Sequence, residues 1–256
     1  MKIVTWNVNS VRARLPRVLP WLELEQPEVV CLQETKVQDG DFPADAFRAL
    51  GYEVAFHGQK SYNGVALLSK LPMTEIERGF PGDPVPQEAR AIAATIGGLR
   101  VVNLYVVNGE AVGSEKYAKK LAWLRALTEH VESFGASRSR TVLTGDFNIT
   151  FDDRDVYDPA SWRDKILCST PEREALASLM QDALHDGLRH LDPGAGIYTW
   201  WDFRLPKSVE RNLGLRIDHF LVGAEARERL RRVAVDVIER AREKPSDHAP
   251  VVASFE

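Results

Sequence analysis

Cysteine is nearly absent from this chain of 256 residues, which contains only two. Two thiols do not make up a disulfide framework, and their scarcity favours a reducing, cytoplasmic location. No apolar run approaches the roughly 18 residues that a membrane-spanning helix needs, so we expect no membrane association. The N-terminal segment enters a strand-like pattern without a small-residue cleavage site, so we expect no signal peptide.

A strong excess of one charge is also missing. The net charge of −4 argues against a protein that coats polyanions indiscriminately. It is compatible with an enzyme that gathers carboxylates around a metal ion and surrounds them with basic residues. Several basic clusters could form such a rim, or could equally be solvated faces. These clusters are Arg12, Arg14 and Arg17; Lys116, Lys119 and Lys120; and Arg204, Lys207, Arg211 and Arg216.

Low-complexity tracts, polar linkers and fixed-period repeats are lacking as well. The composition, 44% hydrophobic and 27% charged, is ordinary for a globular protein long enough to bury a core. We therefore expect one domain over residues 1–256.

Ten apolar or alternating segments predict strands. They are residues 2–7, 28–33, 52–57, 64–69, 91–96, 100–107, 140–145, 215–222, 233–240 and 250–255. Capping residues and helical spacing predict helices at 10–22, 114–134 and 170–184, the first kinked or shortened by Pro16 and Pro20. Gly97-Gly98 predicts a hairpin, so part of the sheet is antiparallel. These elements indicate a two-sheet α/β sandwich with helices outside.

Acidic, amide or imidazole side chains stand at the ends of five predicted strands. They are Asn7, Glu34, Asp146 with Asn148, Asp218, and Asp247 with His248. Taken singly, such a residue is more often a turn residue, a helix cap or a structural histidine. Their number and their shared position at strand ends indicate a common site.

Hydrolysis of a phosphodiester needs a divalent ion, a base for water and donors for the developing charge. Carboxylate and amide oxygens suit Mg²⁺, so Glu34 and Asp247 are candidate metal ligands. Asn7 is a candidate neutral ligand or positioning group.

The remaining roles have candidates too. Asp146 would be the base, and Asn148 would hold the water or a phosphate oxygen from the same side of the strand. Asp218 would orient His248 and favour its charged form, which makes the imidazole a phosphate donor. Tyr105 offers a phenolic O–H at another strand end.

Six segments form an ordered set of motifs along the chain. They are Trp6-Asn7-Val8-Asn9, Leu32-Gln33-Glu34-Thr35-Lys36, Gly64–Ser69, Gly145-Asp146-Phe147-Asn148, Gly214–Asp218 and Ser246-Asp247-His248-Ala249-Pro250. In this order they resemble the exonuclease III family of DNA repair nucleases and abasic-site endonucleases. The resemblance implies a deoxyribonuclease I-like fold, a four-layer α/β/β/α sandwich of two mixed sheets.

The resemblance also implies an activity. It is an Mg²⁺-dependent phosphodiesterase, with Mn²⁺ able to substitute, in which water activated by Asp146 attacks a metal-bound phosphate. The implied partner is duplex DNA with recessed or damaged 3′ ends or abasic sites, bound by a monomer. The implied activities are 3′→5′ exonuclease, 3′-phosphatase or 3′-diesterase, and abasic-site endonuclease. The implied metal set is Glu34, Asn7, Asp247, Asp146 and Asn148, and the implied catalytic set is Asp146, His248, Tyr105, Asn148 and Asp218.

Further positions match the family's substrate side. They are Asn108, Arg90, Trp200, Trp201, Leu215, Ile217 and Lys36. Among these, the apolar side chains would form a slot for a 3′-terminal or flipped-out sugar. Residues 150–168 match poorly, and we expect a surface loop over the site.

Two alternatives remain open. One is a phosphoesterase of the same fold that acts on inositol phosphates, sphingomyelin or RNA. The other is a DNA-binding relative without catalytic activity.

Overall fold

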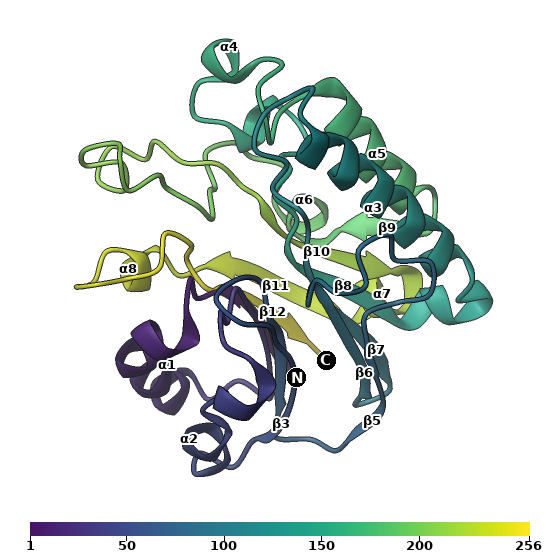
Figure 1. Ribbon diagram of the computed structural model, residues 1–256, viewed down its shortest axis with the longest axis vertical. Coiled ribbons are helices and arrows are strands. Elements are labelled where there is room, and N and C mark those ends of the chain that lie inside the picture. Colours follow the sequence, from purple (N-terminus) through teal and green to yellow (C-terminus); the bar gives the residue numbers. More distant parts are fainter.

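Two six-stranded mixed sheets pack face to face in the computed structural model, which describes residues 1–256 (Figure 1). The first sheet has the order β11 (Leu230–Val235), β12 (Val251–Phe255), β1 (Lys2–Asn7), β2 (Val29–Gln33), β4 (Val65–Ser69), β3 (Glu53–His57). The second has the order β5 (Met73–Arg78), β6 (Ala91–Ile96), β7 (Leu99–Tyr105), β8 (Thr141–Asp146), β10 (Asp218–Gly223), β9 (Leu184–Asp186). The predicted sandwich of two mixed sheets is confirmed.

Helices cover the outer face of each sheet (Figure 1). α1 (Val11–Glu25) and α2 (Ala44–Arg48) cover the first sheet, and α3 (Glu115–Glu132) and α5 (Thr170–Met180) cover the second. Shorter helices follow in the loops: α4 (Pro159–Trp162), α6 (Gly187–Leu191), α7 (Ala224–Arg229) and α8 (Val237–Arg240). Single 3₁₀ turns occupy Asp39–Asp41 and Asp153–Asp155, and a longer one occupies Gly135–Arg140. None of the helices has the length and apolar character that crossing a bilayer requires.

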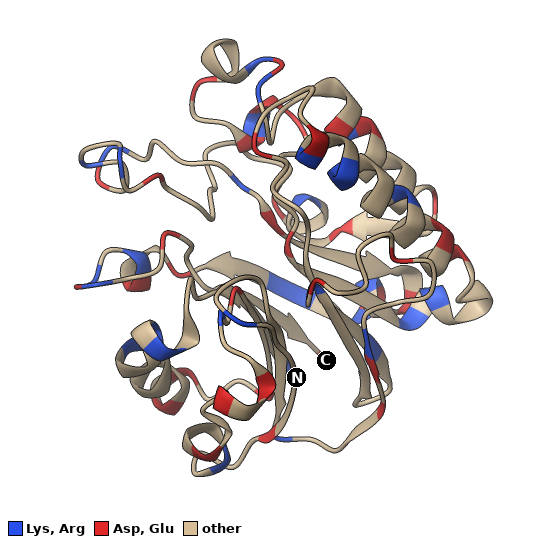
Figure 2. Ribbon diagram, viewed as in Figure 1, with Lys and Arg blue, Asp and Glu red and all other residues tan.

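The central core lies between the sheets. Ile3 and Val29 of the first sheet pack there with Val101 and Val142 of the second, and none of these four side chains is exposed. Helices bury the opposite faces, so β2 is buried along its whole length. Figure 2 shows that most charged residues lie on helices and loops, while the strands are largely uncharged. Apolar burial therefore fixes the sandwich and leaves its edges for polar groups.

Some predicted elements differ from the structure. The hairpin at Gly97-Gly98 is confirmed, since β6 and β7 pair antiparallel. Pro16 and Pro20 were expected to kink or shorten the first helix, and they do not shorten it, because α1 continues to Glu25. Both prolines lie on the exposed side of α1, so packing of its other face on the sheet offsets the lost hydrogen bonds.

The predicted strand 233–240 is wrong in its second half. β11 ends at Val235, and Val237–Arg240 forms α8. The Asp236 side chain caps this helix by accepting a hydrogen bond from the Glu239 N–H at 3.1 Å. The cap stops the strand although the apolar pattern continues.

Strand direction brings the polar strand ends together. β1 and β2 run parallel, with Asn7 opposite Gln33, and β7 and β8 run parallel, with Tyr105 opposite Asp146. Neighbouring parallel strands place their carboxyl ends at the same edge of a sheet. β10 pairs antiparallel with β8 and begins at that edge, with Asp218 opposite Asp146. One edge of the sandwich therefore collects side chains from both sheets.

Candidate active site

Asn7 joins the two sheets at this edge. Its side-chain N–H₂ donates to Glu34 Oε1 at 2.8 Å and to Asp146 Oδ2 at 2.9 Å. Its Oδ1 accepts from the Asn9 backbone N–H at 3.0 Å. Because the amide nitrogen, not the oxygen, faces the carboxylates, Asn7 positions them. Of the two roles expected for Asn7, this geometry favours the positioning group over the neutral metal ligand.

Glu34 is held in an uncommon backbone conformation just after β2. Its φ of 51° lies in the left-handed region, as does the φ of 55° at Lys36. The Ser10 N–H donates to the Glu34 carbonyl at 2.7 Å and keeps the turn in place. Lys36 Nζ lies 2.7 Å from Glu34 Oε2, and 17% of the Glu34 side chain remains exposed. The carboxylate is therefore oriented by two donors and still reachable.

His248 lies between two buried carboxylates. Its Nδ1 is 2.9 Å from Asp218 Oδ2, and its Nε2 is 3.6 Å from Asp146 Oδ2. Burial alone would lower the pKa of His248, but the charges of Asp218 and Asp146 outweigh burial and raise this pKa to about 10. The ring is therefore a cation near pH 7, as the sequence predicted for an Asp218–His248 pair.

Asp146 is almost fully buried at the end of β8. Its Oδ1 accepts the Asn148 backbone N–H at 2.9 Å. Burial, together with the charges of Asp218 and Glu34, raises its pKa to about 7, although the His248 charge opposes the shift. A carboxylate with a pKa near the working pH is suited to accept a proton from water.

The site fits a divalent cation. Glu34, Asp146 and His248 place potential ligand atoms within 4.8 Å of one another. His248 is a poor ligand because its raised pKa keeps it protonated, which leaves two carboxylates as hard oxygen ligands. A buried oxygen of Asp218, Oδ1, has no hydrogen-bond partner.

Asp247, which the sequence predicted as a metal ligand, lies outside this group of three. Its Oδ1 accepts from Asn9 Nδ2, and its Oδ2 accepts from Trp200 Nε1, both at 3.0 Å. Burial opposes ionisation of Asp247, but the nearby His248 charge and these two hydrogen bonds lower its pKa. Asp247 is an ionised carboxylate that fixes the loop carrying His248.

Tyr105 and Asn108 extend the site from the end of β7. Burial and the charges of Glu34 and Asp146 raise the pKa of Tyr105 well above its usual range, so the phenol keeps its proton. The Arg90 guanidinium lies 5.0 Å from the Tyr105 ring centroid and donates to the Tyr105 carbonyl at 3.2 Å. Arg90 is 8% exposed, so it packs against the ring from the protein interior. Asn108 is exposed at the rim.

The apolar residues expected around a sugar slot separate into two groups. Trp200 is half-buried and packs against Leu215 and Ile217, which are 0% and 2% exposed. Trp201 is 0% exposed and packs with Tyr198 in a separate cluster. The expectation that Trp201 lines an open slot is therefore wrong.

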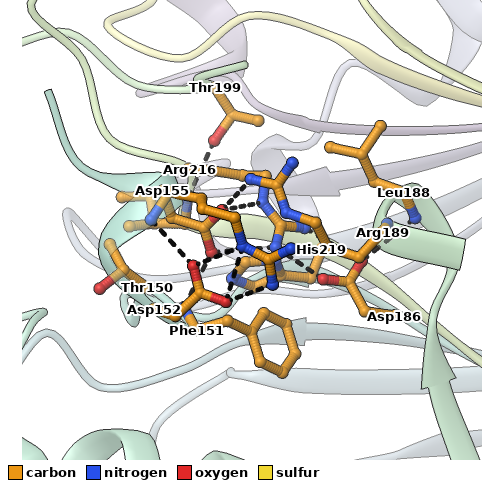
Figure 3. Close-up of polar contacts among 12 residues, drawn as sticks. Thr150, Phe151, Asp152, Asp155, Asp186, Leu188, Arg189, Thr199, Arg216 and His219 are labelled. Carbon is orange, nitrogen blue, oxygen red and sulfur yellow. Dashed lines mark hydrogen bonds and ion pairs between the residues drawn. The ribbon is translucent and has the colours of Figure 1, made fainter. Parts of the chain in front are cut away.

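Residues 150–168 are fixed by buried ion pairs (Figure 3). Arg216 Nε lies 2.7 Å from Asp155 Oδ1, and Arg216 Nη2 lies 2.6 Å from Asp186 Oδ2. Arg189 also pairs with Asp155, whose other oxygen accepts the Phe151 N–H at 2.9 Å. No local sequence pattern marks Asp155, because its partner Arg216 is 61 residues away.

Two of the expected rim cations are therefore core residues. Arg216 is 1% exposed and Lys120 is 0% exposed. Both are paired with buried carboxylates, Arg216 with Asp155 and Asp186 and Lys120 with Glu172. They are unavailable to a ligand, and the rim hypothesis applies only to the exposed members of their clusters.

The four-layer sandwich and this edge cluster define a deoxyribonuclease I-like hydrolase of the nuclease class. The chain belongs to the endonuclease/exonuclease/phosphatase family, whose model matches residues 4–248. It is 38% identical to exodeoxyribonuclease III of Haemophilus influenzae over 267 aligned positions, with 100% of each chain covered.

Solved structures agree. A 3′-5′ exonuclease from Neisseria meningitidis superposes with a TM-score of 0.97 at 45% identity, covering 100% of both chains. An AP endonuclease from Archaeoglobus fulgidus gives a TM-score of 0.96 at 38% identity, covering 100% of this chain and 99% of the other. The predicted family and fold are confirmed.

Proposed function

We propose that this nuclease is an Mg²⁺-dependent DNA repair phosphodiesterase acting on duplex DNA at recessed or damaged 3′ ends and at abasic sites. The observation that carries the proposal is the bridge from Asn7 to Glu34 and Asp146, with the charged ring of His248 beside it. The names of the exodeoxyribonuclease, exonuclease and AP endonuclease relatives support DNA as the substrate.

Glu34 and Asp146 would hold the cation, with Mn²⁺ as a substitute for Mg²⁺. When bound, the ion supplies charge neutralisation at the phosphate and at the leaving oxygen. Asn148 contributes by its backbone N–H, which orients Asp146.

The chain's own groups perform the proton chemistry. Asp146 accepts the proton of the attacking water at Oδ2, the oxygen that Asn7 orients. The His248 Nε2–H and the Tyr105 O–H donate to phosphate oxygens that gain charge as water adds. Asp218 keeps His248 charged, because it binds Nδ1 on the far side of the ring.

The proposed sugar site lies beside Trp200. This residue borders an open pocket of about 210 Å³ together with Tyr157, Trp162 and Leu213. Trp200 also forms an isolated bridge with His248, so this pocket adjoins the phosphate side of the site. We assign it to a 3′-terminal or abasic sugar, with Asn108 and Lys36 near the flanking phosphate. We also propose that the chain is a single cytoplasmic domain that acts as a monomer.

Three end-labelled duplexes test the proposal in one experiment. They carry a recessed 3′ end, a 3′-phosphate at a nick, and an internal abasic site, and an inositol phosphate serves as the competing substrate. We expect Mg²⁺-dependent cleavage of at least one duplex, stopped by chelation. Asp146→Asn should slow it by about 10²–10⁴-fold, the usual contribution of a general base. Preferred hydrolysis of the inositol phosphate, or DNA binding without cleavage, would contradict the proposal.

A further inference from the structure

Lys120 is a buried cation that the chemistry above does not use. It lies on α3 with a side-chain exposure of 0%, and it pairs with Glu172 of α5, which is also 0% exposed. Its ammonium also donates to two backbone carbonyls, those of Asn108 at 3.1 Å and Asn148 at 2.7 Å. All of its hydrogen bonds are therefore internal, and two of them reach the loops of the candidate active site.

The two carbonyls belong to residues on the loops that follow two neighbouring strands at the site edge. Asn108 follows β7 and Asn148 follows β8, and the Asn108 Nδ2 donates to the Asn148 Oδ1 at 2.9 Å. Asn148 has a left-handed φ of 52°, a conformation that needs support from its surroundings. Its N–H also orients Asp146. The Lys120 ammonium thus joins the two loops through their backbone carbonyls, and the Asn108 and Asn148 side chains join them through a second hydrogen bond.

A glycine in the neighbouring backbone leaves space for the Lys120 side chain. Gly109 has a φ of +93°, and a Cβ at this position would lie 3.2 Å from Lys120 Cδ and 2.9 Å from Ile166 Cδ1. Glu172 extends the network further, because it accepts the backbone N–H groups of Leu167 and Ser169 at 3.1 Å each. The cation therefore links the loops after β7 and β8 to the end of segment 150–168.

Stability alone does not account for a lysine here. Replacing a buried ion pair by well-packed neutral groups is often neutral or stabilising, because the desolvation of both charges is avoided. An apolar side chain in place of Lys120 would have no N–H groups to donate to the two carbonyls. The ammonium has three N–H groups, and its three partners are the two carbonyls and Glu172.

We propose that Lys120 is a positioning residue for phosphate hydrolysis, which sets the separation of the loops that carry Asn108 and Asn148. The inference rests on the proposed function. Without these two hydrogen bonds, Asn148 and the Asp146 carboxylate it orients should shift relative to the phosphate. A displacement of about 1 Å can reduce turnover by about 10²-fold.

Two variants that differ only at Lys120 provide the test. Glu172→Gln keeps one acceptor for the capping box and leaves the Lys120 donors on both carbonyls, and its free energy of unfolding should fall because the buried ammonium loses its counter-ion. The double variant Lys120→Met/Glu172→Gln removes those donors without leaving a buried carboxylate unpaired. We expect the double variant to lose about 10²-fold in kcat relative to Glu172→Gln, with KM changed less than about threefold. Both are assayed on the duplex that wild type cleaves, below their melting temperatures.

A half-exposed Lys–Glu pair at the opposite end of β1 is the matched control. Lys2 and Glu25 are 3.3 Å apart, and Lys2→Met/Glu25→Gln should leave kcat unchanged. Equal kcat in the double variant and in Glu172→Gln would overturn the inference, and so would a loss confined to melting temperature or to KM. Absence of cleavage by wild type would contradict the proposed function instead, so the two failures are distinguishable.

Discussion

Ionisable side chains a few ångströms apart at the sheet edge differ in charge because their neighbours differ. Asp146 has a pKa of about 7 among carboxylates, whereas His248 has a pKa of about 10 between two of them. Asp218 contributes to both shifts, since it repels charge on Asp146 and stabilises charge on His248. Asp218 therefore favours both roles, the proton acceptor at Asp146 and the charged donor at His248.

Asp218→Asn should therefore lower the pKa of His248 from about 10, because the largest charge that stabilises the imidazolium is removed. NMR titration of the His248 ring in metal-free protein measures the change. Replacing the exposed carboxylate Asp45, on α2, by asparagine is the control and should leave the titration unaltered. An unchanged His248 titration in Asp218→Asn would contradict the assigned pairing.

Residue types predicted the site better than they predicted side-chain direction. Glu34, Asp146, Asp218 and His248 meet as the strand-end pattern indicated. The place of Asp247 outside the cluster could not be predicted, because adjacency to His248 does not reveal which way its carboxylate points. Its direction is set by donors on Asn9 and Trp200, which are 238 and 47 residues away in the sequence.

His219 gives a pH dependence of stability that is separate from the site chemistry. It is 1% exposed, and burial together with the Arg216 charge lowers its pKa to about 4. The unfolded chain, with a histidine pKa of about 6.5, binds more protons between pH 6.5 and 4. The contribution of His219 to the free energy of unfolding should therefore be fully present above pH 6.5 and fall by about 3 kcal/mol on acidification to pH 4.

Chemical denaturation across this pH range measures the effect. His219→Gln can still donate to the Ile149 carbonyl, which the wild-type ring contacts at 2.7 Å, but it does not titrate. Between pH 6.5 and pH 4, the unfolding free energy of this variant should fall by about 3 kcal/mol less than that of wild type. A slope equal to wild type would show that His219 is not the group responsible.

At the scale of elements, periodicity predicted strands that are buried but not strands that are exposed or very short. β5 was missed because most of its residues are exposed, and β9 was missed because it has only three residues. Segment 150–168 was expected to be a surface loop. Much of it does lie on the surface, including residues 160, 161 and 163–165. The pairing of Asp155 with Arg216 anchors the segment, so that its buried residues cover Leu215 and Ile217.

Asp155→Asn should destabilise the protein by about 3–5 kcal/mol, because the buried Arg216 loses a partner. Denaturant unfolding gives the stability, and hydrogen exchange should show faster opening of residues 150–168 than of α3. Asp152→Asn is the matched control on the same segment. Its pair with Arg154 is 41% and 46% exposed, so the expected cost is below about 1 kcal/mol. Equal costs for the two variants would contradict the role given to Asp155.

At the scale of the whole molecule, the site exists only if the two sheets keep their relative position. Asn7 and Glu34 come from the first sheet, and Asp146 comes from the second. Apolar packing between sheets is not directional, so it does not by itself fix this position. A buried polar bridge supplies direction, since Gln33 Nε2 donates to Asn103 Oδ1 at 2.7 Å across the interface.

Asn103 also donates to the carbonyls of Leu32 and Ala66, both at 2.9 Å, so it binds two strands of the opposite sheet. Asn103→Leu should lower the free energy of unfolding by about 2–4 kcal/mol, because buried polar groups lose their partners. It should also reduce kcat, because Gln33, the other end of the bridge, immediately precedes Glu34 in the chain. Gln33→Leu/Asn103→Leu removes both ends of the bridge, and its cost should be less than the sum of the single costs. Additive costs would show that the two amides act independently and that the register of the sheets is fixed by packing alone.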